Sequence, residues 1–301
     1  MSAIRSIFWN KSENRIRAFF RILILILSAS VFVSIIALIA DNFDELSEKS
    51  FLNFLIMLAI LASIYFVGRY VDKRKWGDFG ISILPVKQFV YGSFLGSLLV
   101  IIIFFVQYLL GWLMLNEIHF NKFPSAAFSL VFAGQVFRYL CGSIFEEAFS
   151  RGYLLLNIAE GLFGKISKQK AVTMAYIITS SIFGLLHLVN DHASWLSSIN
   201  LILIGLLFGW TVVKIGKLHF AIGLHAFWNI FQNNVFGFAN SGKKPIVSFY
   251  SFDNSGSSLW TGGEFGIEGG LICTIIVLLT LILMSYREVF RNKKLNQKVL
   301  K

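Results

Sequence analysis

The sequence predicts an all-α polytopic membrane protein with about eight transmembrane helices. The 301-residue chain is 56% hydrophobic, and its mean hydropathy is +0.71. Only 14% of its residues are charged, well below the roughly 25% of soluble domains. A soluble fold must keep a largely polar surface. The composition therefore excludes a soluble single domain, a disordered chain, a disulfide scaffold and a nucleic-acid-binding protein.

Apolar runs of the required length define the helices, because a crossing needs about 20 mainly apolar residues. Eight segments qualify, at about 19–40, 51–70, 88–115, 126–157, 171–190, 196–214, 218–237 and 269–287. The third and fourth are long for one crossing, so we expect tilt or protruding turns. We divide the chain into a basic N-terminal segment with three transmembrane helices and an interfacial segment (1–125), five helices carrying the polar motifs below (126–287), and a basic tail (288–301).

The basic residues predict the orientation. Of the 27 Lys and Arg residues, 21 lie in segments 1–21, 69–87, 165–170, 214–217 and 287–301, which fall on one side of the membrane if the predicted crossings alternate. This is the positive-inside pattern, and it puts both termini in the cytoplasm. It also explains the net charge of +11 without nucleic acid. We expect a multi-pass protein of a bacterial cytoplasmic membrane that contacts membrane lipids.

Two connections and two cysteines have simpler interpretations. The amphipathic stretch 76–86 is broken by Gly80 and Pro85, and we interpret it as an interfacial segment on the cytoplasmic side. The outer connection 238–268 is rich in Gly and Ser; we expect a plain surface loop, with a cap over a cavity as the alternative. Cys141 and Cys273 lie in apolar stretches, so we expect buried thiols.

Three ionisable residues interrupt the fourth apolar segment. Glu146, Glu147 and Arg151 lie among Phe and Leu residues, where each charge costs roughly 2.5–3.5 kcal/mol at the bilayer centre. Glu147 and Arg151 are four residues apart, so they can pair on one helix face. Glu146 points about 100° away and is not neutralised by that pair. Glu146 is therefore a candidate general base, whereas the other two could form a structural salt bridge.

Two further helices carry polar groups with helical spacing. Phe183 and His187 are four residues apart, as are His225 and Asn229. Each histidine or amide alone is explained by hydrogen bonding between helices. Together the groups supply a general base, a water site and oxyanion donors. Ser150 has no feature of a nucleophile beyond its place near Glu146, and the chain has no HExxH zinc motif.

The three motifs resemble those of a known family. EEAFSR (146–151) matches EExxxR, FGLLH (183–187) matches FxxxH, and HAFWN (225–229) matches HxxxN. In this order on apolar helices they are similar to the CPBP family of CAAX-protease and bacteriocin-processing membrane endopeptidases, the Abi family, which includes Rce1-like proteases. The resemblance covers about 126–287.

The resemblance implies an intramembrane glutamic-type protease that needs no cofactor. By motif position, Glu146 and His187 would activate a water, and His225 and Asn229 would stabilise the oxyanion. Glu147, Arg151 and Phe183 would be supporting residues. Zinc held by Glu146, His187 and His225 is the alternative, because this ligand set is common in zinc enzymes.

Two other functions explain part of the pattern. A proton-coupled transporter would use buried carboxylates and histidines, but would string them across the bilayer. A non-catalytic immunity or regulatory protein of the same fold would need no turnover. The protease hypothesis requires the polar groups to converge on one cavity, and its substrate would be a membrane-associated or lipid-modified protein or peptide.

Overall fold

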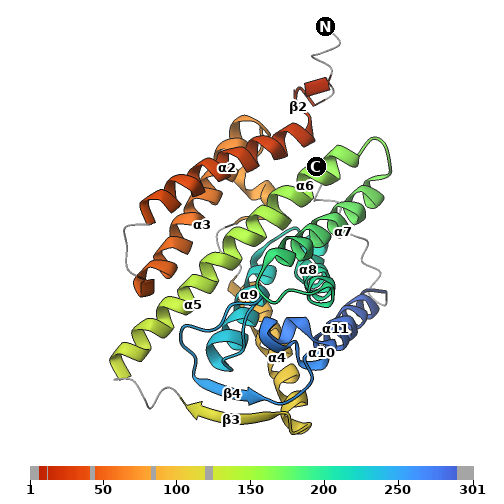
Figure 1. The fold of residues 1–301 in the computed structure, drawn as a ribbon. Helices are drawn as coiled ribbons and strands as arrows, with labels where there is room; N and C mark the ends of the chain where they lie inside the picture. Colours follow the sequence, from red (N-terminus) through yellow and green to blue (C-terminus); the bar gives the residue numbers. More distant parts are fainter. Residues whose placement is uncertain (1–6, 12, 41–44, 83–85, 119–124, 290–301) are drawn as a thin grey trace.

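The computed structural model describes residues 7–11, 13–40, 45–82, 86–118 and 125–289, and most of them are helical (Figure 1). Its longer elements are α2 (Ala18–Ala40), α3 (Glu45–Tyr70), α4 (Val86–Leu109), β3 (Leu113–Ile118), α5 (Ser125–Glu147), η3 (Ala148–Leu154), α6 (Leu155–Leu162), α7 (Lys168–Leu186), α8 (Trp195–Ile215), α9 (His219–Asn229), η5 (Ile230–Val235), β4 (Tyr250–Asn254) and α11 (Leu271–Val289). The short elements are β1 (Trp9–Asn10), β2 (Arg15–Ile16), η1 (Trp76–Phe79), η4 (His187–Val189), α10 (Ser258–Thr261), η6 (Gly263–Phe265) and η7 (Ile267–Gly269). The prediction of an all-α membrane protein is confirmed.

Six helices in the described ranges are long and apolar enough to cross a membrane: Ala18–Leu38, Phe51–Tyr70, Val86–Leu109, Ala127–Leu162, Lys168–Val189 and Trp195–Ile215. The last two predicted segments correspond to α9 with η5, and to α11, whose apolar part Leu271–Tyr286 is shorter than these six helices. The count of eight crossings therefore stays a prediction. The continuous helix of α5, η3 and α6 has 36 residues in its apolar part and exceeds the roughly 20 that a bilayer requires.

The predicted helix at 88–115 is wrong at its C-terminal end. Helix α4 ends at Leu109, and Gly111 takes a left-handed φ of +73°, which reverses the chain at little cost because glycine lacks a Cβ. Strand β3 follows and pairs antiparallel with β4, with Leu113 opposite Asn254. This small sheet lies at the end of the bundle away from the N-terminus (Figure 1).

The long helix formed by α5, η3 and α6 divides the bundle (Figure 1). Helix α3 packs against α5, and α2 packs against both α3 and α6. On the other side, α7 packs against α6 and α8, whereas α9 packs against α4, α5 and α8. The helices that carry the three sequence motifs, α5, α7 and α9, are thereby brought around one interior region.

Glycines bring α4 and α9 into close contact. A Cβ at Gly92 would lie 2.1 Å from the carbonyl oxygen of Phe220, and one at Gly96 would lie 2.3 Å from that of Leu224. The two glycines are spaced GxxxG on α4, a pattern that lets membrane helices approach closely. Because α9 carries His225, this backbone contact sets the position of the HxxxN motif.

A buried ionic cluster ties the other end of the bundle together. Arg21 pairs with Asp72 at 2.9 Å and with Glu160 at 2.8 Å, and Arg15 pairs with Glu160 at 3.0 Å. Arg74 also contacts Glu160, and burial lowers the pKa of Arg74 to about 10. The cluster joins the β2 region, α2, the end of α3 and α6.

Two predicted segments lie only partly within the described residues. Of the interfacial segment 76–86, residues 83–85 lie outside them; η1 is described, and its Phe79 is buried against Tyr153 with ring centroids 5.5 Å apart. Most of the basic tail 288–301 also lies outside them. Cys141 and Cys273 are buried, as predicted.

Candidate active site

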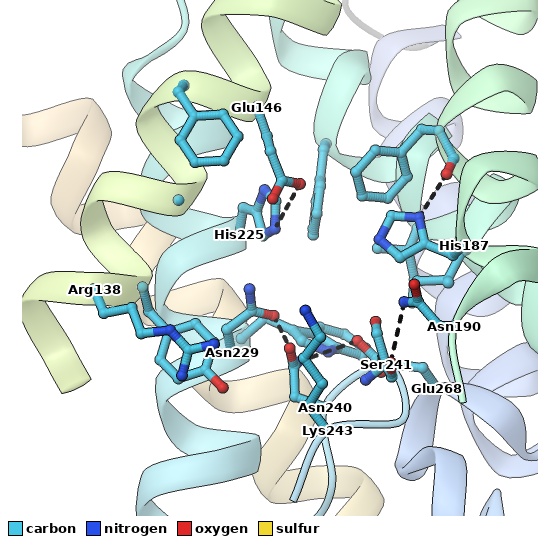
Figure 2. A pocket seen from close by; sticks show the side chains of 18 of the residues that line it. Arg138, Glu146, His187, Asn190, His225, Asn229, Asn240, Ser241, Lys243 and Glu268 are labelled. Carbon is cyan, nitrogen blue, oxygen red and sulfur yellow. Dashed lines mark hydrogen bonds and ion pairs between the residues drawn. The ribbon is translucent and has the colours of Figure 1, made fainter. Parts of the chain in front are cut away.

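A polar cavity of about 210 Å³ lies between α5, α7, α8 and α9 (Figure 2). Its polar lining consists of Asn53, Arg138, Tyr139, Glu146, His187, Asn190, His225, Trp228, Asn229, Asn240, Ser241, Lys243 and Glu268. The four residues assigned a catalytic role from the motifs, Glu146, His187, His225 and Asn229, all line it. Helices α3, α5 and α9, the end of α7 and the connection 238–268 thus contribute polar groups to the same space.

The two adjacent glutamates have different surroundings. The Glu146 side chain is 36% exposed and faces the cavity, whereas the Glu147 side chain is fully buried. Oε1 of Glu147 lies 3.0 Å from Nη1 of Arg151 in a buried i,i+4 ion pair. Directly after Glu147 the chain widens into the π-helix η3, and such π-turns often occur at functional sites.

Arg151 is enclosed by α8 and by an aromatic ring. Its Nη2 donates to the backbone carbonyl of Gly205 at 3.1 Å. A Cβ at Gly205 would lie 3.1 Å from the same nitrogen, so the absent side chain makes room for the guanidinium. The guanidinium carbon also lies 4.5 Å from the centroid of the Phe183 ring. Arg151 and Phe183 therefore connect η3 to α7 and α8.

His225 is oriented from behind by Glu147. Its Nδ1 donates to Oε1 of Glu147 at 2.9 Å, and its ring stacks on Phe208 with centroids 4.6 Å apart. Nε2 faces Glu146, with 3.9 Å between this nitrogen and Oε2 (Figure 2). The buried carboxylate of Glu147 thus contacts both Arg151 and His225, whereas the carboxylate of Glu146 faces the cavity.

His187 is oriented by its own helix. It follows the last residue of α7, and its Nδ1 lies 2.7 Å from the carbonyl oxygen of Phe183. A carbonyl can only accept, so Nδ1 carries the proton and Nε2 carries the lone pair in the neutral ring. The four-residue spacing of FxxxH therefore places the carbonyl oxygen of Phe183 where it fixes the tautomer of His187.

Asn229 is oriented by the loop after η5. Nδ2 of Asn240 donates to Oδ1 of Asn229 at 3.0 Å and lies 3.4 Å from Oε1 of Glu268 (Figure 2). Oε2 of Glu268 accepts from the backbone nitrogen of Ser241 at 2.8 Å. Burial raises the pKa of Glu268, while its hydrogen bonds with Ser241 oppose the shift. Because Oδ1 of Asn229 accepts from Asn240, Nδ2 of Asn229 is available to donate a hydrogen bond to another group.

The loop 238–268 is therefore more than a plain surface loop, and that expectation is wrong. Asn240, Ser241, Lys243 and Glu268 all line the polar cavity. The local sequence does not predict these contacts with the cavity, because they form only where the chain reverses direction after η5. Arg138 could have been found: it is a charge in an apolar helix, two turns before Glu146, and such charges mark functional sites.

The region that carries the motifs matches a family model. Residues 128–231 match the family described as type II CAAX prenyl endopeptidase Rce1-like. They form an Rce1-like domain. The resemblance inferred from the three motifs is confirmed, since all three fall within this range. No curated protein matches the chain, and no solved structure matches it either.

A second, apolar cavity adjoins the polar one. It has a volume of about 430 Å³ and is lined by residues of α2, α3, α5, η3 and α7, including Ile26, Val33 and Leu186. Glu146 and His187 line both cavities. The candidate general base thus lies where a polar space meets an apolar one.

The geometry does not match the zinc alternative. Glu146, His187 and His225 are suitable ligand types, and the Nδ1 contacts of both histidines resemble those of zinc-bound histidines. In the described part of the chain, however, no three His, Cys, Asp or Glu side chains gather closely enough to hold one metal ion. We therefore derive no step through a metal.

Proposed function

We propose that the Rce1-like domain hydrolyses a peptide bond within the membrane by means of a water activated by Glu146 and His187. The observation that supports this proposal most directly is that Glu146, His187, His225 and Asn229 line one cavity. A proton-transfer pathway would instead distribute such groups across the bilayer. The family match supports a protease of the CAAX type in general terms.

The proposed reaction begins with a water between Glu146 and His187. Nε2 of His187 accepts a hydrogen bond from this water, and Glu146 takes its proton as the oxygen attacks the peptide carbonyl. The C–N bond then breaks, and protonated Glu146 returns the proton to the leaving amine. Glu146 ends each cycle as it began, so the steps require no further reactant.

Asn229 and His225 would stabilise the negative oxygen that forms on the carbonyl. Nδ2 of Asn229 is available as a donor because Oδ1 accepts from Asn240. His225 donates from Nε2 only when both ring nitrogens carry a proton. Glu147, bonded to Nδ1 of this ring, is placed to balance that charge.

The two adjoining cavities suggest the type of substrate. A peptide in the polar cavity could place an apolar group, either a side chain or an attached lipid, in the space lined by Ile26, Val33 and Leu186. The scissile bond would then lie at the boundary, beside Glu146. We propose a membrane-associated peptide or protein with an apolar group next to the cleaved bond.

The orientation of the cavity follows from the charges. Asn190, Asn240 and Lys243 lie on the connections that follow α7 and η5, and we call the end of the cavity that they line its polar end. The basic segments Lys165–Lys170 and Lys214–Lys217 lie at the opposite ends of α7, α8 and α9. With those segments in the cytoplasm, the polar end opens on the extracytoplasmic side.

The test compares membrane peptides from cells that contain the wild-type protein with those from cells that contain Glu146→Gln. We expect a peptide cleaved only with the wild type, and loss of cleavage in Glu146→Gln and His187→Ala although both insert normally. Full activity in either variant would contradict the mechanism. If no peptide differs, the immunity or regulatory function is favoured.

Metal dependence is tested separately. We expect purified active protein to contain no stoichiometric zinc and to keep its activity after dialysis against a chelator. One zinc ion per chain, together with inactivation on its removal, would replace the water-activation mechanism with a metal-dependent one.

A further inference from the structure

An apolar groove of about 460 Å³ lies between α4 and α9. Four phenylalanines and two serines form most of its lining: Phe89, Phe94, Phe227, Phe231, Ser93 and Ser97. Phe94 is 67% exposed, so the groove opens toward the outside of the bundle. It shares no lining residue with the polar cavity or with the apolar cavity beside Glu146. The groove is therefore separate from the candidate active site.

The two serines form the hollow because their side chains are short and their hydroxyl groups bond to their own helix. Oγ of Ser93 donates to the carbonyl oxygen of Phe89, and Oγ of Ser97 donates to that of Ser93, each at 2.9 Å. Aromatic rings flank the hollow from both helices, and the rings of Phe89 and Phe227 meet edge to face with centroids 6.1 Å apart. A groove with this lining accepts an apolar chain.

The groove has the length of one leaflet. Residues 89–101 of α4 line it and span about 18 Å, close to the roughly 15 Å of hydrocarbon in half a bilayer. Beyond them, Phe105 and Tyr108 continue the same helix face, and both are exposed and lie outside the lining. A partner helix would contact α4 through both leaflets, whereas this hollow is confined to one. It therefore fits the acyl chain of a lipid.

Lys87 lies one turn before the groove on the same face of α4. Positions 87, 90, 94 and 97 are three or four residues apart, so their side chains form one row on the helix. Lys87 is exposed, and its Nζ lies 5.7 Å from the centroid of the Tyr91 ring. With the basic segments in the cytoplasm, this ammonium group lies at the level of the lipid headgroups of the cytoplasmic leaflet.

Helix α9 brings a second lysine to the same end of the groove. Successive glycines of α4 face successive turns of α9, so the two helices run in the same direction and their N-termini lie together. Lys217 is exposed in the turn before α9. The backbone nitrogen of Leu218 donates to the carbonyl oxygen of Gly80 at 3.2 Å, which holds this turn against the segment that precedes α4.

We propose that this groove and Lys87 form a binding site for one anionic phospholipid of the cytoplasmic leaflet. One acyl chain lies between the phenylalanine rings, and the phosphate lies against Lys87. Lys217 adds to the positive potential at the headgroup, since each lysine close to the membrane surface attracts anionic lipid. The site does not depend on the proposed peptide hydrolysis.

A lipid in the groove supports α9 from the side opposite the polar cavity. Phe227 lies two residues from both His225 and Asn229, which corresponds to about 200° around a helix. His225 and Asn229 line the polar cavity, whereas Phe227 and Phe231 line the groove. The acyl chain thus packs behind the HxxxN segment, and its binding should raise the thermal stability of the protein.

Native mass spectrometry of the full-length protein in detergent tests the site. The probes are dipalmitoyl phosphatidylglycerol, dipalmitoyl phosphatidylcholine and glycerol phosphate. We expect one phosphatidylglycerol per chain, bound about fivefold more tightly than phosphatidylcholine, because one lysine at a membrane surface contributes about that ratio. Phosphatidylglycerol should also raise the unfolding temperature. Glycerol phosphate, which carries the phosphate without the acyl chains, should neither bind nor stabilise the protein.

Matched variants assign the binding to the two parts of the site. Lys87→Gln should lower the affinity for phosphatidylglycerol about fivefold, to the level of phosphatidylcholine, and Lys217→Gln should lower it less. Lys165→Gln, which alters an exposed lysine before α7, should leave it unchanged. Ser97→Leu fills the hollow and should weaken the binding of both lipids. Ser34→Leu makes the same change at an exposed position of α2 and should weaken neither.

Four results would each reject the site: equal affinities for the two lipids, no lipid binding, tight binding of glycerol phosphate alone, or an unchanged preference in Lys87→Gln. Lipid binding that survives Ser97→Leu would place the acyl chain elsewhere. A dimer that Ser97→Leu disrupts would identify a second copy of the chain as the occupant. Because Lys87 is exposed, its variant is expected to fold normally, and the binding result stands whether or not the protein cleaves a peptide.

Discussion

Nδ2 of Asn240 donates to Oδ1 of Asn229 over 3.0 Å, and the same nitrogen lies 3.4 Å from Glu268. A residue of the loop thus fixes which end of the Asn229 amide faces the substrate. Without this contact the amide can turn, and its oxygen would then face the developing oxyanion. In the proposed mechanism the loop therefore orients a catalytic residue although it contributes no reacting atom.

Asn240→Ala is therefore expected to lower kcat about tenfold with little change in KM. Asn229→Ala, which removes the donor itself, should cost about 100–1000-fold. Steady-state kinetics on the peptide found in the membrane comparison measures both. Asn254→Ala serves as control, because Asn254 bonds Gln107 outside the cavity. A rise in KM alone would indicate that Asn240 binds substrate instead.

The same substitution should affect stability very differently at the two adjacent glutamates. Glu147→Gln breaks a buried network with Arg151 and His225, and loss of one member of a buried pair costs about 3–5 kcal/mol of stability. Glu146→Gln removes a part-exposed carboxylate and should change stability by less than about 0.5 kcal/mol. Thermal unfolding in detergent compares them. Equal losses of stability would mean that Glu146 is also structural.

Local sequence information identified four polar residues that the structure places at one cavity. Glu146, His187, His225 and Asn229 stand out as polar groups in apolar helices, and the i,i+4 rule indicates which of them share a face. The Glu147–Arg151 ion pair, 3.0 Å long, has the spacing that this rule describes. Local information also located the helices, except that the predicted helix at 88–115 continues past the end of α4 at Leu109.

The long-range contacts could not be predicted from the sequence, for physical reasons. Strand β3 pairs with β4 about 135 residues later, and a short run such as Leu113–Ile118 cannot reveal a distant partner because helix and strand both accept it. Glu268 likewise reaches Asn240 only after β4 and two short helical turns. For Arg138, the sequence shows its spacing from Glu146, but it does not show that the two residues line the same cavity.

The close contact of α4 and α9 gives a prediction for a residue outside the polar cavity. Gly96→Ala places a methyl group 2.3 Å from the carbonyl oxygen of Leu224, and backbone cannot yield as a side chain can. We expect a loss of about 1–3 kcal/mol of stability, as for other overpacked sites, together with reduced activity as His225 moves.

Gly77→Ala is the matched control for this substitution. No neighbour lies within 4 Å of a Cβ at Gly77, so thermal stability should be nearly unchanged. If both variants behave alike, close backbone approach does not position α9.

The proposed orientation can be checked by labelling cysteines in intact cells. Lys244 follows Lys243 of the cavity lining and is exposed, and Lys165, in the connection before α7, is exposed too, so each can be replaced by cysteine. The native Cys141 and Cys273 are 2% and 0% exposed, so they should not react. A membrane-impermeant maleimide should label Lys244→Cys in intact cells, and Lys165→Cys only after the membrane is opened. The reverse pattern would place the mouth of the cavity in the cytoplasm, and substrates would then have to arrive from inside the cell.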